Sequence, residues 1–108
     1  MGQDLGQLDD QAVGTASGTT LTLTAKPTRN QTWEVAQVSV ECEAAPTGAT
    51  CVMRKNGRVV TPLVPNLDAA GGDPPITLRP ADELTVTWTG LAGGEVATMN
   101  YFYRLVNP

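Results

Sequence analysis

The chain has no histidine among its 108 residues. Histidine is the most common general base near neutral pH and the most common protein ligand for metal ions. The two cysteines cannot complete a tetrahedral zinc site by themselves, because such a site needs four ligands. We therefore expect a protein that is not an enzyme and that holds no cofactor or metal.

The acidic residues do not replace the missing histidine. Asp82 and Glu83 are adjacent in the sequence and lie in an expected turn, where they are solvated charges rather than a catalytic pair. The other acidic residues do not have the spacing of an established calcium loop. Carboxylate chemistry and calcium binding are therefore not expected.

Positive charge is scarce, with 7 Lys and Arg against 11 Asp and Glu, which gives a net charge of −4. Nucleic-acid binding depends on clustered basic residues that displace counterions from phosphates. Arg54, Lys55 and Arg58 form the single basic cluster, and they flank a turn as solvated hairpin charges. We expect no direct contact with nucleic acid.

Long apolar runs are also missing. No stretch approaches the ~20 apolar residues that a membrane-spanning helix requires, and the first residues lack the basic-then-apolar pattern of a signal peptide. We expect a soluble chain with no membrane contact.

Alternating apolar and polar residues dominate what is present. Thr20 to Ala25 alternates without a fault, which predicts a half-buried strand. Thr32 to Glu43 predicts a longer strand whose parity changes near Ala36 and Gln37, and a bulge at this point would return every large apolar side chain to the core. The side chains that this bulge would align are Trp33, Val35, Val38, Val40 and Cys42.

Turn residues separate the remaining strands. Asn56-Gly57 predicts a tight hairpin, and residues 75–89 read as two strands joined by a tight polar turn at a sheet edge. Residues 65–74 are rich in Pro, Asn, Asp and Gly, which predicts an exposed connection. About seven strands without a helix-period segment indicate an all-β fold. We expect a single two-sheet sandwich, Greek-key or jelly-roll like, over residues 19–108.

Residues 1–18 are rich in Gly, Gln and Asp, and they predict an extended N-terminal arm outside the core. The candidate anchors of this arm are Leu5, Leu8 and Val13. Such an arm is either a disordered end or a segment that becomes ordered by lying across a neighbouring subunit.

The last strand, residues 95–106, has large apolar residues on both faces. A sandwich strand with one face in water usually lacks this pattern. Either the arm covers the second face or another subunit does, so Tyr101, Phe102 and Tyr103 are candidate interface residues. The alternative is a core face opposite a few isolated surface aromatics.

Cys42 and Cys51 flank a short loop, which would place them opposite each other on one hairpin. A disulfide there would stabilise the fold by ~2–3 kcal/mol. The alternative is two thiols that act as small core apolar groups, as expected for a chain made in a reducing cytoplasm.

Two segments resemble a known family. Residues 32–40 read TWEVAQVSV, and residues 75–90 read PITLRPADELTVTWTG before a Gly-rich hairpin and a long final strand. A W-x-V-x-x-V-x-V strand and an L-x-P-x-D-x-L-x-V-x-W hairpin recur in small β-sandwich virion proteins of tailed bacteriophages, especially those that infect actinobacteria. Over residues 19–106 the chain resembles these proteins, in particular those of the capsid decoration or accessory type.

The resemblance implies a structural virion protein that is made in the host cytoplasm and lies on the capsid exterior. It would be a decoration protein that binds and reinforces the shell of the major capsid protein. It also implies self-association, since trimers are common among such proteins.

Two other functions remain open at this stage. One is a phage tail, fibre or head-fibre component that contacts the host surface. The other is an extracellular carbohydrate-binding module, with Trp33 and Trp88 as exposed platforms, although both alternate in register with Val and Leu and are therefore expected in the core.

Overall fold

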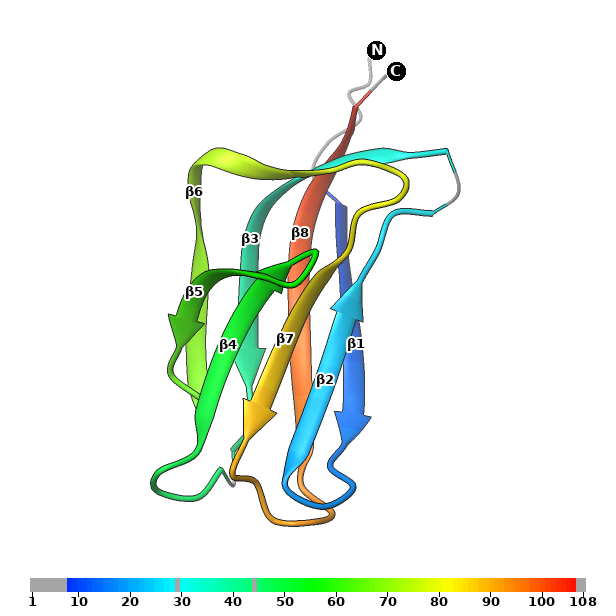
Figure 1. Cartoon of the computed structure of the whole chain (residues 1–108). Helices are drawn as coiled ribbons and strands as arrows, with labels where there is room; N and C mark the ends of the chain where they lie inside the picture. Colours follow the sequence, from blue (N-terminus) through cyan, green and yellow to red (C-terminus); the bar gives the residue numbers. More distant parts are fainter. Residues whose placement is uncertain (1–7, 29, 44, 107–108) are drawn as a thin grey trace.

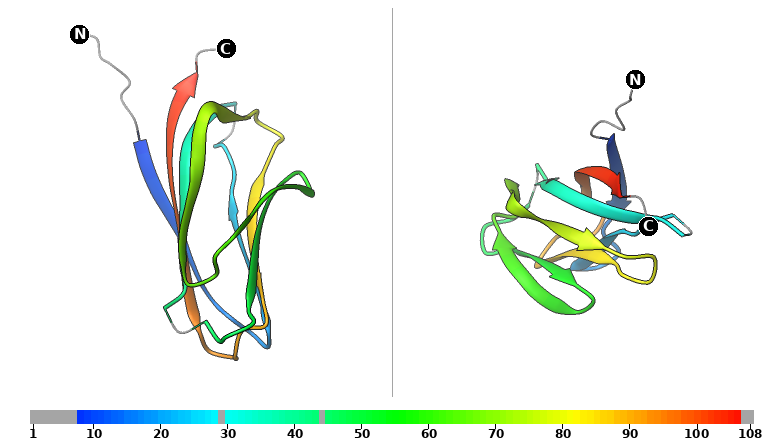
Figure 2. Two further views of the ribbon diagram at one scale, coloured as in Figure 1. Left: turned by 90° about the vertical axis from the view of Figure 1, so that its left-hand side faces the viewer. Right: turned by 90° about the horizontal axis from the view of Figure 1, so that it is seen from above.

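The computed structural model describes residues 8–28, 30–43 and 45–106, without the side chains of residues 72 and 73. These residues form eight strands and no helix, and so contain no helix that could cross a membrane. Figure 1 shows the strands, and Figure 2 shows the two sheets packed face to face. The strands are β1 (Leu8–Thr15), β2 (Thr20–Ala25), β3 (Thr32–Glu41), β4 (Thr50–Lys55), β5 (Arg58–Leu63), β6 (Leu67–Leu78), β7 (Leu84–Thr89) and β8 (Val96–Val106).

The two sheets have the strand order of a jelly roll. The first sheet has the order β1-β8-β3-β6 and the second has the order β2-β7-β4-β5. Strands β1 and β8, β2 and β7, β3 and β6, and β4 and β5 are antiparallel neighbours. The chain therefore runs back and forth between the sheets, and the predicted all-β, two-sheet sandwich is confirmed. The strand count is eight rather than about seven.

The core lies between the sheets and is made by the alternation that the sequence displays. Its largest fully buried side chains include Trp88, Met53, Leu78, Leu84 and Met99. Apart from Leu78 at the end of β6, each comes from a strand in which apolar residues recur at every second position, so that this face packs inward. No polar or charged side chain of the described residues is buried.

The predicted bulge in β3 is present. The pairing of β3 with both neighbours shifts register between Val35 and Gln37. Trp33, Val35 and Val38 are all buried as a result, because the extra residue changes the parity of the strand.

The Asn56-Gly57 hairpin between β4 and β5 is also confirmed. Both residues have positive φ, 51° and 84°, as a type I′ turn requires.

Residues 65–74 were predicted as an exposed connection. Most of them are exposed, but the prediction of a loop was wrong, because residues 67–74 belong to a strand. Strand β6 begins at Leu67 and pairs along β3 at the edge of the first sheet. An edge strand tolerates prolines because one side of its backbone has no ladder partner. Asp68 starts the strand by accepting hydrogen bonds from the amides of Val64 and Ala69, at 2.8 and 2.7 Å.

The two strands predicted within residues 75–89 exist, but they do not lie side by side in one sheet. The first is the end of β6 in the first sheet, and the second is β7 in the second sheet. The turn between them crosses from one sheet to the other. Asp82 accepts hydrogen bonds there from the Arg79 amide and the Asn56 side chain, both at 2.9 Å. Turn chemistry alone does not distinguish a hairpin from such a crossing.

Half of the predicted arm belongs to the sandwich. Leu8–Thr15 forms β1, which pairs with β8 from Leu8 opposite Tyr103 to Thr15 opposite Val96. Gly14 allows this strand to lie close to β2, because a Cβ there would meet the side chains of Leu21 and Leu23 at 3.0 and 2.8 Å. After the strand, the Ala16 amide donates to the Glu95 carbonyl at 2.8 Å. The expected boundary after residue 18 therefore does not separate an arm from the sandwich.

Candidate functional site

The candidate interface residues are distributed over both faces of β1 and β8. Leu8 and Val13 on β1 are 41% and 54% exposed. Tyr101 is buried at 6% exposure and is therefore a core residue, which corrects its expected place on the surface. Phe102 and Tyr103 are half-buried. Leu5 lies outside the described residues.

Tyr101 and Tyr103 are held by Trp33 in an aromatic cluster on the inner face of the first sheet. The ring centroid of Trp33 lies 4.0 Å from that of Tyr103 and 5.9 Å from that of Tyr101, with both pairs stacked. The indole nitrogen donates to the Gln31 side chain at 3.0 Å. This cluster fixes the end of the core next to Leu8, which pairs with Tyr103.

The acidic residues of β1 change the electrostatics of this cluster. Burial raises the pKa of the Tyr101 phenol above its ordinary value, and the charge of Asp10 raises it further. Burial also raises the pKa of Tyr103, followed by the charges of Asp10 and Asp9. Both phenols are therefore neutral at physiological pH and are hydrogen-bonding groups rather than bases.

The outer face of the same two strands carries a shallow hollow of about 300 Å³. The register of β1 and β8 sets Asp9 beside Phe102 and Gln11 beside Asn100 on this face. Asp10, which lies between them and pairs with Tyr101 of the inner face, also contributes to the lining. The hollow therefore combines one aromatic ring with amides and carboxylates. Such a surface can receive a polar or basic side chain of a partner, but it has no nucleophile or paired acid and base.

The two tryptophans are not exposed platforms. Trp33 is 3% exposed and Trp88 is fully buried. The Trp88 indole donates to the carbonyl of Pro65 at 3.0 Å, which satisfies its polar atom inside the protein. Their burial agrees with the core placement expected from the sequence and counts against a carbohydrate site built on these rings.

The two cysteines belong to different parts of the sandwich. Cys42 follows β3 of the first sheet, and Cys51 lies in β4 of the second sheet opposite Trp88 and Leu63. The expected placement on one hairpin was wrong, because the short loop between them crosses the sandwich. Both are buried thiols. Burial raises the pKa of Cys51 to about 12, with smaller contributions from Asp68 and Cys42.

The acidic pairs considered from the sequence do not form a site. Within the described ranges, no group of three or more His, Cys, Asp or Glu side chains could hold a metal ion. Asp82 and Asp68 instead stabilise turns, and their hydrogen bonds to backbone amides lower both pKa values. These carboxylates are structural.

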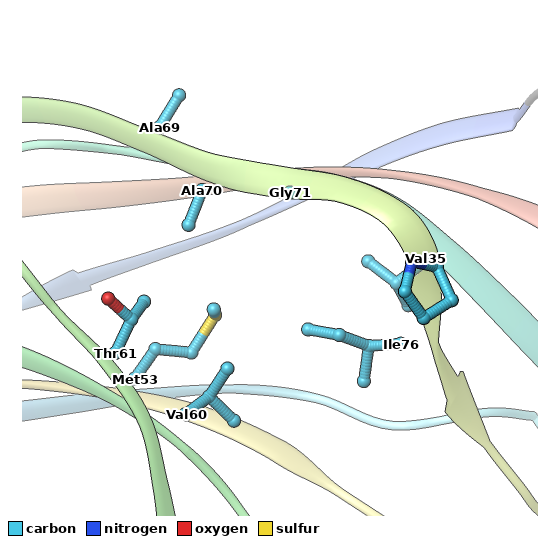
Figure 3. A pocket seen from close by; sticks show the side chains of 9 residues that line it. Val35, Met53, Val60, Thr61, Ala69, Ala70, Gly71 and Ile76 are labelled. Atoms are coloured by element: carbon cyan, nitrogen blue, oxygen red, sulfur yellow. The ribbon is translucent and has the colours of Figure 1, made fainter.

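A larger pocket, of about 440 Å³, lies at the opposite side of the molecule between the edge strands β5 and β6. Figure 3 shows its lining, in which Met53, Val60, Ala70 and Ile76 point toward a common space. Sequence reasoning missed this pocket because it placed residues 65–74 in a loop. The signal was the exposed pair Val59 and Val60 in the strand after Asn56-Gly57, which alternation does not explain.

No protein-family model matches the chain, and no curated protein matches its sequence. Among solved structures, the fold is similar to the crystal structure of FLHE, with a TM-score of 0.57 and 14% sequence identity. The similarity covers 92% of this chain and 98% of that chain. It supports the sandwich architecture and carries no statement about function.

Proposed function

We propose that this protein is a structural virion protein of a tailed bacteriophage. Its role would be that of a decoration protein that binds the outside of the major capsid protein shell and stabilises it. The proposal rests on the resemblance of residues 19–106 to such proteins and on one structural observation. That observation is the accessible edge strand β1, whose exposed Val13 shares the outer face with the hollow lined by Phe102. Leu8 is exposed at the start of the same strand, on its other face.

An edge strand has unpaired backbone groups that can add to a neighbouring sheet. Among the strands that the structure describes, β1 has β8 on one side and no neighbour on the other. Its Asp9 and Asp10 limit uncontrolled edge pairing, so a partner must place polar or basic groups opposite them. This favours a specific protein contact over aggregation.

Two further observations support the proposal. The net charge of −4 gives the protein no attraction for packaged DNA, as suits the outer surface of a capsid. The jelly-roll order also occurs in viral capsid domains and in lectins. Because folds host many functions, this second observation supports the role only by analogy.

Quantitative mass spectrometry of density-banded particles from the source tests the proposal. Abundance comparable with that of the major capsid subunit is the expected result. A few copies per particle would instead indicate a tail, fibre or vertex component. Absence from particles would contradict any virion role.

A binding assay tests the role of β1. Removing residues 1–18 is unsuitable, because it would also remove a strand of the sandwich. We expect Val13→Asp to reduce binding to undecorated capsids at least tenfold, because it adds charge to the proposed contact. Val59→Asp, which alters a similarly exposed valine of β5, is the matched control. Equal binding by both variants and the unmodified protein would exclude β1 as the contact.

A further inference from the structure

The first sheet ends in the free edges of β1 and β6. Its order is β1-β8-β3-β6, so each of these two has a neighbour on one side alone among the described strands. Figure 1 shows them at opposite sides of the sheet. All neighbours in this sheet are antiparallel. A second copy placed beside the first could therefore continue the sheet, with its β1 antiparallel to β6 of the first copy.

Pairing with β8 decides which backbone groups of β1 face the free edge. The Ala16 amide donates to the Glu95 carbonyl at 2.8 Å, and β1 pairs with β8 in this register without a shift. Amides of successive residues point to opposite sides of a strand. Asp10, an even number of positions before Ala16, therefore faces β8 with its amide, and the Gln11 amide faces outward. The Gln11 amide donates to the Asp10 carboxylate at 2.8 Å.

The same arrangement occurs on β6, at the other edge of the sheet. The Cys42 amide donates to the Asn66 carbonyl at 2.9 Å, and Asp68 pairs with Val40 in the same register. By the same alternation, the backbone of Asp68 faces β3 and the Ala69 amide faces the free edge. The Ala69 amide donates to the Asp68 carboxylate at 2.7 Å.

Both aspartates occupy inward positions of their strands. Asp10 pairs with Tyr101 and Asp68 pairs with Val40, and both of these partners are buried. Inward-pointing charged residues on edge strands are one device by which natural sheets avoid pairing with other chains. Here each carboxylate also binds the outward amide of the residue that follows it.

Each of these hydrogen bonds uses the group that an added strand would need. A strand that joins an edge accepts hydrogen bonds from the outward amides there. Gln11 lies near the middle of β1, and Ala69 lies in the part of β6 that pairs regularly with β3. Hydrogen bonds to a carboxylate are stronger than those between neutral groups. The carbonyl of a second copy would therefore have to displace a stronger acceptor.

We propose that Asp10 and Asp68 guard the two edges of the first sheet and keep copies of this chain from joining edge to edge. Each carboxylate holds the outward amide of the next residue and withholds it from a strand of another copy. Loss of one guard opens one edge, and loss of both lets copies add without limit. This role is separate from the proposed capsid contact and does not depend on it.

Amide exchange with water, measured by NMR, tests the hydrogen bonds directly. We expect the Gln11 amide to exchange at least fivefold more slowly than it does in an unstructured peptide of the same sequence. Asp10→Ala should remove this protection, and Asp10→Asn should keep most of it, because the side-chain amide oxygen also accepts. Equal exchange of Gln11 in the unmodified protein and in Asp10→Ala would overturn the proposal.

Sedimentation velocity over a range of protein concentrations tests the effect on association. Asp10→Ala opens β1 alone, so copies can join through β1 of each and then no further. We expect dimers, with self-association at least tenfold tighter than in the unmodified protein. Asp10→Ala combined with Asp68→Ala opens both edges, so we expect oligomers that grow with concentration and have no fixed size.

Asp9→Ala is the matched control, because it removes the same charge from the outer face of β1, beside Phe102. It should sediment as the unmodified protein does. Association of Asp9→Ala as strong as that of Asp10→Ala would show that charge alone restrains the edge, which would overturn the proposal.

The double variant also loses the hydrogen bond from the Val64 amide to Asp68, so its fold is checked by circular dichroism. Asp10→Ala keeps the proposal falsifiable if the double variant does not fold. A folded Asp10→Ala protein that associates no more than the unmodified protein would exclude the guard on β1. A folded double variant that stops at dimers would exclude the guard on β6.

Discussion

Gly71 lies where β6 comes closest to the backbone of β3. A Cβ atom at this position would lie 2.3 Å from the Ala36 carbonyl oxygen and 2.8 Å from the Gln37 Cα, and neither backbone atom can move aside easily. We expect Gly71→Ala to lower the free energy of unfolding by about 1–3 kcal/mol, measured by urea denaturation. Gly93→Ala is the control, because a Cβ there meets nothing closer than 3.8 Å. Equal effects of both substitutions would contradict the close approach at the bulge.

The chain has two tyrosines, so their ionisation can be followed by phenolate absorbance. Burial and then Asp10 raise the pKa of both phenols above the ordinary value of 10.0. We expect Asp10→Asn to lower both pKa values, while Asp82→Asn leaves them unchanged. An unaltered titration curve for Asp10→Asn would show that the carboxylate does not act on the cluster.

The raised pKa values of the two phenols also predict how the stability of the fold changes at high pH. A phenol whose pKa is raised by folding stabilises the folded state below its unfolded pKa. This contribution is lost as the pH rises from 10.0 through the higher folded pKa values. The free energy of unfolding should therefore decrease above pH 10.0, and more steeply in the unmodified protein than in Asp10→Asn.

The cysteines give a third test at the level of single residues. Both thiols are buried, and the pKa of Cys51 is raised to about 12. Because the thiolate is the reactive form, we expect neither cysteine to react with iodoacetamide at pH ~8 in the native protein. Both should react in denaturant without a reductant, as counted by mass spectrometry. No labelling in denaturant before reduction would reveal a disulfide.

At the scale of elements, alternation predicted the strands that have one buried face. Thr20 to Ala25 and the bulged strand from Thr32 were predicted with their inward side chains, because a period of two directly reports which face is buried. The first part of β6, residues 67–74, was missed because Gly71, Pro74 and Pro75 carry the signals of a loop. An edge strand can contain these residues since only one side of its backbone must pair.

Strand β1 was missed for a different reason. Its inward positions carry small or polar residues such as Asp10, Ala12 and Gly14, because it covers the edge of the sandwich rather than its centre. The candidate pocket was missed along with β6, since it exists only where two irregular strands from different sheets meet. The packing of one sheet against the other depends on the whole fold, and it leaves no pattern in a short stretch of sequence.

Deleting residues 1–15 distinguishes a strand from an arm. The deletion removes the partner of β8 and exposes the inner side of Tyr101 and Met99, so we expect the melting temperature to fall by more than ~5 °C. The melting temperature is measured by circular dichroism on heating. The double substitution Leu8→Ser and Val13→Ser, which keeps the backbone of β1, should have a much smaller effect. An unchanged melting temperature after deletion would show that β1 does not support the fold.

At the scale of the whole molecule, the two sides of the jelly roll differ in character. The β1 side carries the hollow with Asp9 and Asp10, and the β5–β6 side carries a pocket of about 440 Å³ over Val35 and Met53. The two edges therefore present different surfaces to a partner.

The pairing of β1 with β8 brings the beginning and the end of the sandwich to one pole (Figure 1), with Leu8 opposite Tyr103. A circularly permuted protein, with a short linker that joins residues 106 and 8 and a new opening between Asn56 and Gly57, should therefore keep the fold. We expect its near-ultraviolet circular dichroism to match that of the unmodified protein. A cargo fused near either original end would project from this same pole, where the Asn56 hairpin also lies, and would leave the opposite pole with the β7–β8 turn accessible.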